Sequence, residues 1–394
     1  MKKRKRLPLL VYVLIAIVLG ISMGYIFPDW ITRIFVTFNS FFGQFISFCV
    51  PLIILALVSA AIAETSDNAG RMLLMTLGLA YLSTVVAGVV SYTTSSWVFP
   101  HWIIPTDTLT VATGGTTLIP YFKIMLPPAL DVLSALALAF MLGLGITATR
   151  ANVLKQGLLE LRSVIMLVIE KAVVPLLPLY IFGIFLQMSA SGEVGQVLKT
   201  FMVVIIVIFA LHILWLLFLY VVAGVVARRN PLRLMATMLP AYLTALATSS
   251  SAATIPVTLQ QAKKTGASPN VVDFVIPLCA NIHLSGSCLK IVACSLAMMI
   301  MVGQPFSFGM FLGLICLLAI TLVAAPGVPG GAIMAALPIL ESVLGFTPEM
   351  QALIISLYIA MDSFGTACNV MGDGALTTII NATMRHKSTQ QLSR

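Results

Sequence analysis

The chain has 394 residues, 60% of them hydrophobic and only 9% charged, and it carries a formal net charge of +9. A soluble globular domain carries about 25% charged residues, so the composition excludes a chain whose main solvent is water. The net charge does not indicate a nucleic-acid partner, because the basic residues lie at the ends of apolar runs and act as positive-inside topology signals. These residues are Lys2 to Arg6, Arg71, Arg228, Arg229, Arg233, Lys263, Lys264, Arg385 and Lys387. We therefore expect a multi-pass protein of the cell inner (plasma) membrane, with both termini in the cytoplasm.

Hydropathy predicts six ordinary membrane helices before residue 230, because each apolar run is long enough to cross about 30 Å of hydrocarbon. They lie near residues 9–27, 41–63, 72–99, 130–149, 164–188 and 200–227. The first is a retained helix rather than a signal peptide, since it lacks a small-residue cleavage site and more spans follow it. Pro127 and Pro128 break helix, so we expect the fourth span to be kinked or in pieces.

The region after Asn230 differs, because polar or helix-breaking clusters interrupt its apolar stretches. The clusters are Thr248 to Ser251, His283 to Ser287, Pro326 to Gly331, and Asn369 to Asp373. Non-helical backbone persists at membrane depth only where it lines a protein cavity. The first and third clusters sit between apolar arms of about 15 residues, too short to span twice. We interpret both as re-entrant hairpins whose tips meet near the midplane, an arrangement typical of transporters.

Ionisable residues inside the membrane cost roughly 2.5–3.5 kcal/mol each and are functional candidates by default. The last third of the chain holds four of them: His283, Lys290, Asp362 and Asp373. Asp362, Thr366, Asn369 and Asp373 recur at intervals of four, three and four, which places them on one helical face. This stripe predicts an inward-facing polar site; the alternative is a structural polar seam between helices.

Four motifs in order resemble those of the dicarboxylate/amino acid:cation symporter family, the relatives of the glutamate transporters. They are TSSSAATIPVT at 248–258, PLCANIHLSGS at 277–287, GVPGGAIM at 327–334 and DSFGTACNVMGD at 362–373. The resemblance implies an all-α polytopic fold of eight transmembrane helices plus two re-entrant hairpins. It also implies a homotrimer with an elevator mechanism, and symport of a small molecule coupled to sodium or protons, not an enzyme.

The resemblance further implies a division of the chain into two parts. Residues 1–70, with the first two membrane helices, and residues 101–190, with the fourth and fifth, would form a scaffold. Residues 71–100, with the third helix, and residues 191–229, with the sixth, would belong to a transport domain. Residues 230–394, as hairpin, helix, hairpin and helix, would hold the substrate and cation site.

Carried over from the family, Asp362 would pair with the substrate's ammonium, Asn369 would meet its α-carboxylate and Thr366 its far end. The two hairpin tips would close the site through Ser249, Ser250, Ser251 and Val328. The chemistry agrees, since a carboxylate attracts an ammonium and the amides at helix N-termini attract a carboxylate.

For sodium, the resemblance implies a cage of Asp373 with main-chain oxygens near Cys279, His283 and Asn369, and a second of main-chain oxygens near Ala324 to Pro326. Hard cations prefer such oxygen ligands. A further sodium site at Tyr81, Thr84 and Ser285 is weakened, because Ser285 replaces the family's aspartate. We therefore expect fewer sodium ions per cycle than in acidic amino acid members, or a proton in one role. Histidine titrates near neutral pH, so His283 is the candidate proton site; the alternative is a hydrogen-bonded packing residue.

Gly365 stands where the family has the arginine that clamps an acidic side chain, which favours a small neutral amino acid as substrate. Lys290, two helical turns after His283 and so on the same face, stands where the family has a tyrosine near that arginine. It could replace the arginine and bind an acidic amino acid or dicarboxylate. It could instead snorkel to an interface or neutralise Asp362 in the empty state.

An intramembrane enzyme is the rival from another class, with Ser250 or Ser251, His283 and an aspartate as a nucleophile triad. The serine tip lacks a Gly-x-Ser-x-Gly elbow, and the aspartates already lie in the polar stripe. The sequence therefore favours a transporter. The retained Asp362 indicates a substrate with an ammonium group.

Overall fold

A computed structural model describes residues 9–65, 71–103, 118–128, 130, 132–190, 194–323, 325 and 330–392. Every regular element in these ranges is helical. The earlier helices are α1 (Leu9–Gly24), α2 (Asp29–Thr65), α3 (Arg71–Val98), η1 (Phe99–His101), α4 (Val132–Thr149), α5 (Asn152–Val168), η2 (Ile169–Val173), α6 (Val174–Ala190) and α7 (Val194–Ala227). The later ones are α8 (Pro231–Thr248), α9 (Ser251–Lys264), α10 (Pro269–Ile282), α11 (Ser285–Met301), α12 (Phe308–Val323), α13 (Gly331–Leu344), α14 (Pro348–Ala360) and α15 (Asp362–Leu392).

Local sequence signals explain where several of these helices begin. Asn230 caps α8 by accepting a hydrogen bond from the backbone N–H of Arg233 (3.1 Å), and Pro231 takes the first helical position. Thr347 caps α14 in the same way, again followed by a proline. These caps satisfy backbone donors that would otherwise be unpaired at the helix ends.

Four helical stretches of the described chain are long and apolar enough to cross a membrane: Met72–His101, Asn152–Ala190, Val197–Ala227 and Pro269–Met301. The helices near the first, second and fourth predicted spans also form, but α2 begins at Asp29, well before residue 41. The fifth span begins earlier than predicted, because helix runs from Asn152 through the π turn η2 to Ala190. The predicted kink in the fourth span is wrong, since Pro127 and Pro128 lie before α4 in non-helical chain.

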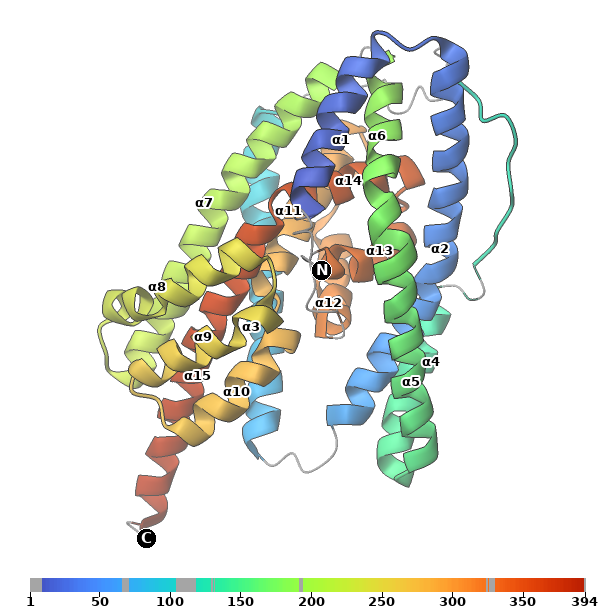
Figure 1. Ribbon diagram of the computed structural model, residues 1–394. Helices are drawn as coiled ribbons and strands as arrows, with labels where there is room; N and C mark the ends of the chain where they lie inside the picture. The colour runs from blue at the N-terminus through green and yellow to red at the C-terminus, as the bar shows by residue number, and fades with distance from the viewer. Residues whose placement is uncertain are drawn as a thin grey trace, which may run out of the picture.

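The helices pack in two groups with a layer between them (Figure 1). α1 lies along α6, and α2 packs against α4, α5 and α6 on the right of the view. On the left, α15 packs against α7 and α8, and α9 lies between α8 and α10. α11 is in the middle, against α3, α7, α14 and α15, and every one of its residues is buried. Polar groups on α11 therefore face protein rather than lipid.

Candidate functional site

The first tip lies between α8 and α9, which pack against each other as the arms of a hairpin. Ser249 reverses the chain in the left-handed conformation (φ +50°), and the Ser250 hydroxyl caps α9 by accepting from the Ala253 N–H (3.3 Å). The Ser249 Oγ lies 2.7 Å from the Ser363 Oγ on α15. Ser251 is buried at the start of α9. The first tip thus contacts the first turn of α15.

The second tip lies between α12 and α13, which also pack on each other. Its last residue, Gly330, has a φ of +75°, a conformation that favours glycine. Its backbone N–H donates a 2.7 Å hydrogen bond to Oδ2 of Asp362. Val328, Ala324 and Pro326, which the sequence assigned to the substrate and sodium sites, lie outside the described residues. Both tips therefore meet the same turn of α15 from different hairpins.

That turn follows a break between two helices. α14 ends at Ala360, α15 begins at Asp362, and the two are bent by 63°. A carboxylate in the first turn of a helix is stabilised by the unpaired N–H groups and the helix dipole there. The break therefore places the Asp362 carboxylate at a helix N-terminus where two hairpin tips converge.

The side chain of Lys290, on α11, is fully buried beside this carboxylate. Its Nζ lies 3.5 Å from Oδ1 of Asp362, 3.3 Å from the Met361 carbonyl oxygen and 3.6 Å from the centre of the Tyr358 ring. Gly365 makes room for it, because a Cβ there would lie only 2.5 Å from Nζ. The lysine thus fills the space beside Gly365, the position where the family has its arginine.

Two expectations about Lys290 are wrong. The side chain does not snorkel to an interface, since it has no exposed surface. It also does not share a helical face with His283, because α10 ends at Ile282 and α11 begins only at Ser285. The contact with Asp362 matches the third alternative, neutralisation of that carboxylate.

Asn369 is buried about two helical turns after Asp362 on α15 and binds the start of α11. Its Oδ1 accepts from the N–H groups of Gly286 (2.8 Å) and Ser287 (3.3 Å), and its Nδ2 donates to the Ser287 hydroxyl (3.0 Å). An amide has two acceptor sites and two donor protons, so the contacts among the described residues leave one N–H for a ligand. Thr366, on the same face of α15, is buried too.

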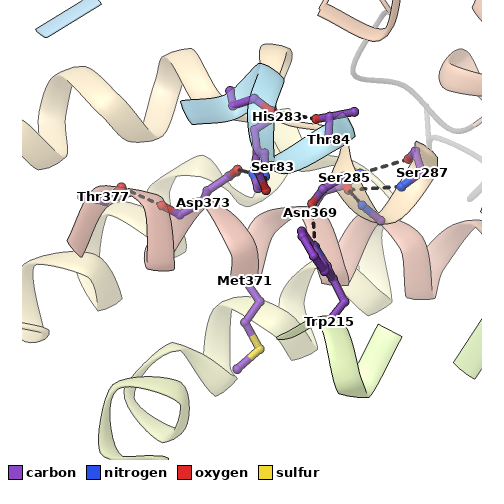
Figure 2. A network of polar contacts seen from close by, with 12 residues as sticks. Ser83, Thr84, Trp215, His283, Ser285, Ser287, Asn369, Met371, Asp373 and Thr377 are labelled. Atoms are coloured by element: carbon purple, nitrogen blue, oxygen red, sulfur yellow. Dashed lines mark hydrogen bonds and ion pairs between the residues drawn. The ribbon is translucent and has the colours of Figure 1, made fainter. Parts of the chain in front are cut away.

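Asp373 lies at the other end of the stripe and pairs with histidine (Figure 2). Nδ1 of His283 donates to Oδ1 of Asp373 (2.9 Å), and Nε2 lies 2.9 Å from the Ser83 hydroxyl on α3. The His283 ring therefore pairs with one oxygen of the carboxylate that the predicted sodium cage uses. The Cys279 carbonyl, another predicted ligand, accepts from the His283 N–H (2.9 Å).

The three residues of the further sodium site each have another partner. The Thr84 hydroxyl donates to the Ala80 carbonyl of its own helix (2.8 Å), and Ser285 accepts from the Trp215 indole (3.2 Å). Tyr81 contacts Cys316 on α12. Ser285 thus uses one acceptor position within the protein, whereas the Thr84 hydroxyl, as a donor, keeps its oxygen lone pairs.

Two hydrogen bonds join Ser83 to His283 and His283 to Asp373, in the order of a hydrolase triad. The serine in this chain is Ser83, not Ser250 or Ser251 as the enzyme hypothesis requires. Ser83 lies within the helix α3, is buried, and is not on an exposed turn as a nucleophile elbow would be. This arrangement serves as a buried polar contact between helices.

Several residues at the site were not expected from the sequence. His212 and Trp215 of α7 bind the α11 start, through the Gly286 carbonyl (3.1 Å) and Ser285. The rule that marks ionisable residues inside membrane spans would have identified His212. Tyr358 looks like an ordinary apolar-span residue, so only its contacts with Lys290 and Ser287 reveal it.

Long apolar helices, broken helices and a closed, buried set of charged and amide groups define a multi-pass membrane transporter. Residues 9–383 match the model of the sodium:dicarboxylate symporter family. The chain belongs to that family, as its four motifs predict, and is a transporter rather than an enzyme.

Relatives with assigned substrates are distant but match along their whole length. The chain is 24% identical to the serine/threonine transporter SstT of Enterococcus faecalis, over 98% of this chain and 94% of that protein. It is 25% identical to the serine/threonine transporter SstT of Acinetobacter baumannii, over 97% of this chain and 98% of that protein.

Proposed function

We propose that the protein is a sodium-coupled symporter of a small neutral amino acid, with serine and threonine as the first candidates. The relatives named above support this substrate class. The structural observation that most supports this proposal is that Lys290, which faces Asp362, fills the space beside Gly365. The arginine that would bind an acidic side chain through two hydrogen bonds is absent from position 365. An acidic side chain thus lacks its bidentate partner.

In this proposal the zwitterion lies along α15. Asp362 takes the ammonium, the remaining Nδ2 proton of Asn369 takes the carboxylate, and Thr366 takes the side-chain hydroxyl. Ser249, Ser250, Ser251 and Val328 close the site from the two tips. The contacts of Ser249 with Ser363 and of Gly330 with Asp362 support this closing role.

We assign fewer sodium ions per cycle to this chain than to acidic amino acid members. The serine at 285, which replaces the family's aspartate and accepts from Trp215, supports the loss of the site at Tyr81, Thr84 and Ser285. The proposed sodium ligands are then Asp373 with main-chain oxygens near Cys279, His283 and Asn369, and the main-chain oxygens of Ala324 to Pro326. Sodium and proton gradients imposed separately across the membrane would show whether a proton is an additional coupling ion.

We also propose an elevator fold of eight transmembrane helices and two re-entrant hairpins, in a homotrimer with both termini in the cytoplasm. Residues 1–70 and 101–190 would form the scaffold and the rest the transport domain. The close packing of α1 on α6 and of α2 on α4 to α6, with only a small contact between α6 and α7, supports this division. The inner membrane is the proposed location.

A thermal-shift screen of purified protein in sodium and in potassium buffer tests the substrate class. We expect serine or threonine to raise the unfolding temperature in sodium, because a ligand at 100 times its Kd stabilises by about 2.7 kcal/mol. Stabilisation by aspartate or succinate alone would contradict the proposal.

The buried Lys290 ammonium favours one alternative, symport of an acidic amino acid or dicarboxylate through this lysine. Lys290→Met and Lys290→Tyr separate the two functions. If Lys290 clamps an acidic substrate, both variants lose aspartate uptake; unchanged aspartate uptake excludes the clamp.

A further inference from the structure

Asp362, the proposed ammonium acceptor, already has a cation of the protein beside it. Lys290 Nζ faces Oδ1, and the Gly330 N–H holds Oδ2. The side chains of both Lys290 and Asp362 are buried, with exposures of 0% and 10%. The carboxylate therefore has its charge balanced without any ligand.

Lys290 is held by more than this one contact. The Met361 carbonyl and the Tyr358 ring face also bind Nζ, and the lysine stem packs on Gly365. The 3.5 Å separation from Oδ1 is at the outer limit of a hydrogen bond. Lys290 can thus leave the carboxylate while the carbonyl and the ring still bind its ammonium.

Two ammonium groups repel each other strongly in a site of low dielectric, so binding of both to Oδ1 at once is unfavourable. An unpaired carboxylate in the same place is also costly. A substrate ammonium and Lys290 are therefore alternative partners of Asp362, one for the loaded and one for the empty carrier.

We propose that Lys290 is a tethered counter-ion that neutralises Asp362 when the carrier is empty. When substrate binds, its ammonium replaces Lys290 as the partner of this carboxylate. The inference rests on the proposed amino acid substrate. Its consequence is kinetic: in the loaded carrier the substrate's ammonium pairs with Asp362, whereas in the empty carrier only Lys290, of the described residues, can do so. Lys290 thus supports the return of the empty carrier and weakens amino acid binding by competition.

The test compares Lys290→Met and Lys290→Gln with wild type in proteoliposomes. Glutamine keeps a donor for the Met361 carbonyl but has no charge. We expect exchange of external labelled serine for internal serine to stay within about twofold of wild type. Net uptake into vesicles without internal serine should fall at least about tenfold, because the empty carrier retains an unpaired carboxylate. The matched control, Lys263→Met, removes a lysine from an exposed pair with Asp273 and should change neither rate.

Binding gives a second readout that a purely structural role would not produce. Serine should bind both variants more tightly than wild type, by about tenfold, and should raise their unfolding temperature more. Exchange and net uptake that fall together, or serine affinity that is unchanged or weaker, would overturn the inference. Wild-type protein that neither binds nor exchanges any neutral amino acid would instead overturn the proposed function.

Discussion

At the scale of single residues, the site depends on pairs in which one residue leaves the space that the other fills, or accepts the hydrogen bonds that the other donates. Gly365 and Lys290 are such a pair, since the missing Cβ provides the space that the lysine stem fills. The sequence showed that both positions depart from the family pattern. It could not show that the two changes compensate each other, because they lie on different helices whose packing is set by the fold.

Gly365→Ala tests this close fit. The new Cβ would displace the Cε and Nζ atoms of Lys290, the far end of a flexible side chain, so we expect the free energy of unfolding to fall by about 1 kcal/mol, the low end for overpacked core positions. Gly313→Ala on α12 is the control, because no described atom beyond its chain neighbours and its own helix backbone lies within 4 Å of the added Cβ. Thermal unfolding of the purified proteins measures both, and equal unfolding temperatures for Gly365→Ala and wild type would contradict the packing.

Asn369 has a structural role, seen in its contacts, and a proposed substrate role, and two variants separate them. Asn369→Ala leaves the Gly286 and Ser287 N–H groups without their acceptor, so we expect a loss of about 2 kcal/mol in stability. Asn369→Asp keeps the acceptor but repels a substrate carboxylate. It should unfold near the wild-type temperature and bind serine at least about tenfold more weakly. Wild-type serine affinity in Asn369→Asp would refute the substrate role.

At the scale of elements, the first two polar clusters in the sequence correctly marked the ends of helices. The fourth, Asn369 to Asp373, does not interrupt a helix as predicted, because it lies within the continuous α15. The serine run falls between α8 and α9, and the break at His283 and Leu284 separates α10 from α11. The bend between α14 and α15 was not predicted, because Met361 carries no proline or glycine signal. Tertiary contacts of Asp362 and Ser363 with the two tips accompany this bend.

A cysteine pair tests whether the first tip must leave α15 during transport. The hydroxyls of Ser249 and Ser363 are 2.7 Å apart, so cysteines there need little adjustment to form a disulfide. We expect oxidised Ser249→Cys/Ser363→Cys protein to lose uptake and to regain it on reduction. The single variants are controls, and uptake by fully cross-linked protein would show that the tip does not move.

At the scale of the whole molecule, composition and hydropathy were sufficient to predict a multi-pass helical protein, and the motifs were sufficient for its family. Hydropathy placed α1 and α3 well but misplaced the starts of α2 and α5, because amphipathic turns extend these helices beyond their apolar runs. The pairing of His283 with Asp373 also needed the structure, since 90 residues separate them.

The oligomeric state is a prediction of the family resemblance that a mass measurement checks. Native mass spectrometry in mild detergent should give three copies of the 42.2 kDa chain. The apolar residues exposed on α5, such as Val153 and Val164, would then lie against lipid or a neighbouring subunit. A monomer at every protein concentration would exclude the trimer.

Radiolabelled serine in proteoliposomes directly measures the proposed sodium-driven uptake of a neutral amino acid. With an inward sodium gradient and no proton gradient, purified protein should accumulate serine above its external concentration. Replacement of sodium by potassium should abolish this accumulation. Uptake that is indifferent to both sodium and proton gradients would contradict symport.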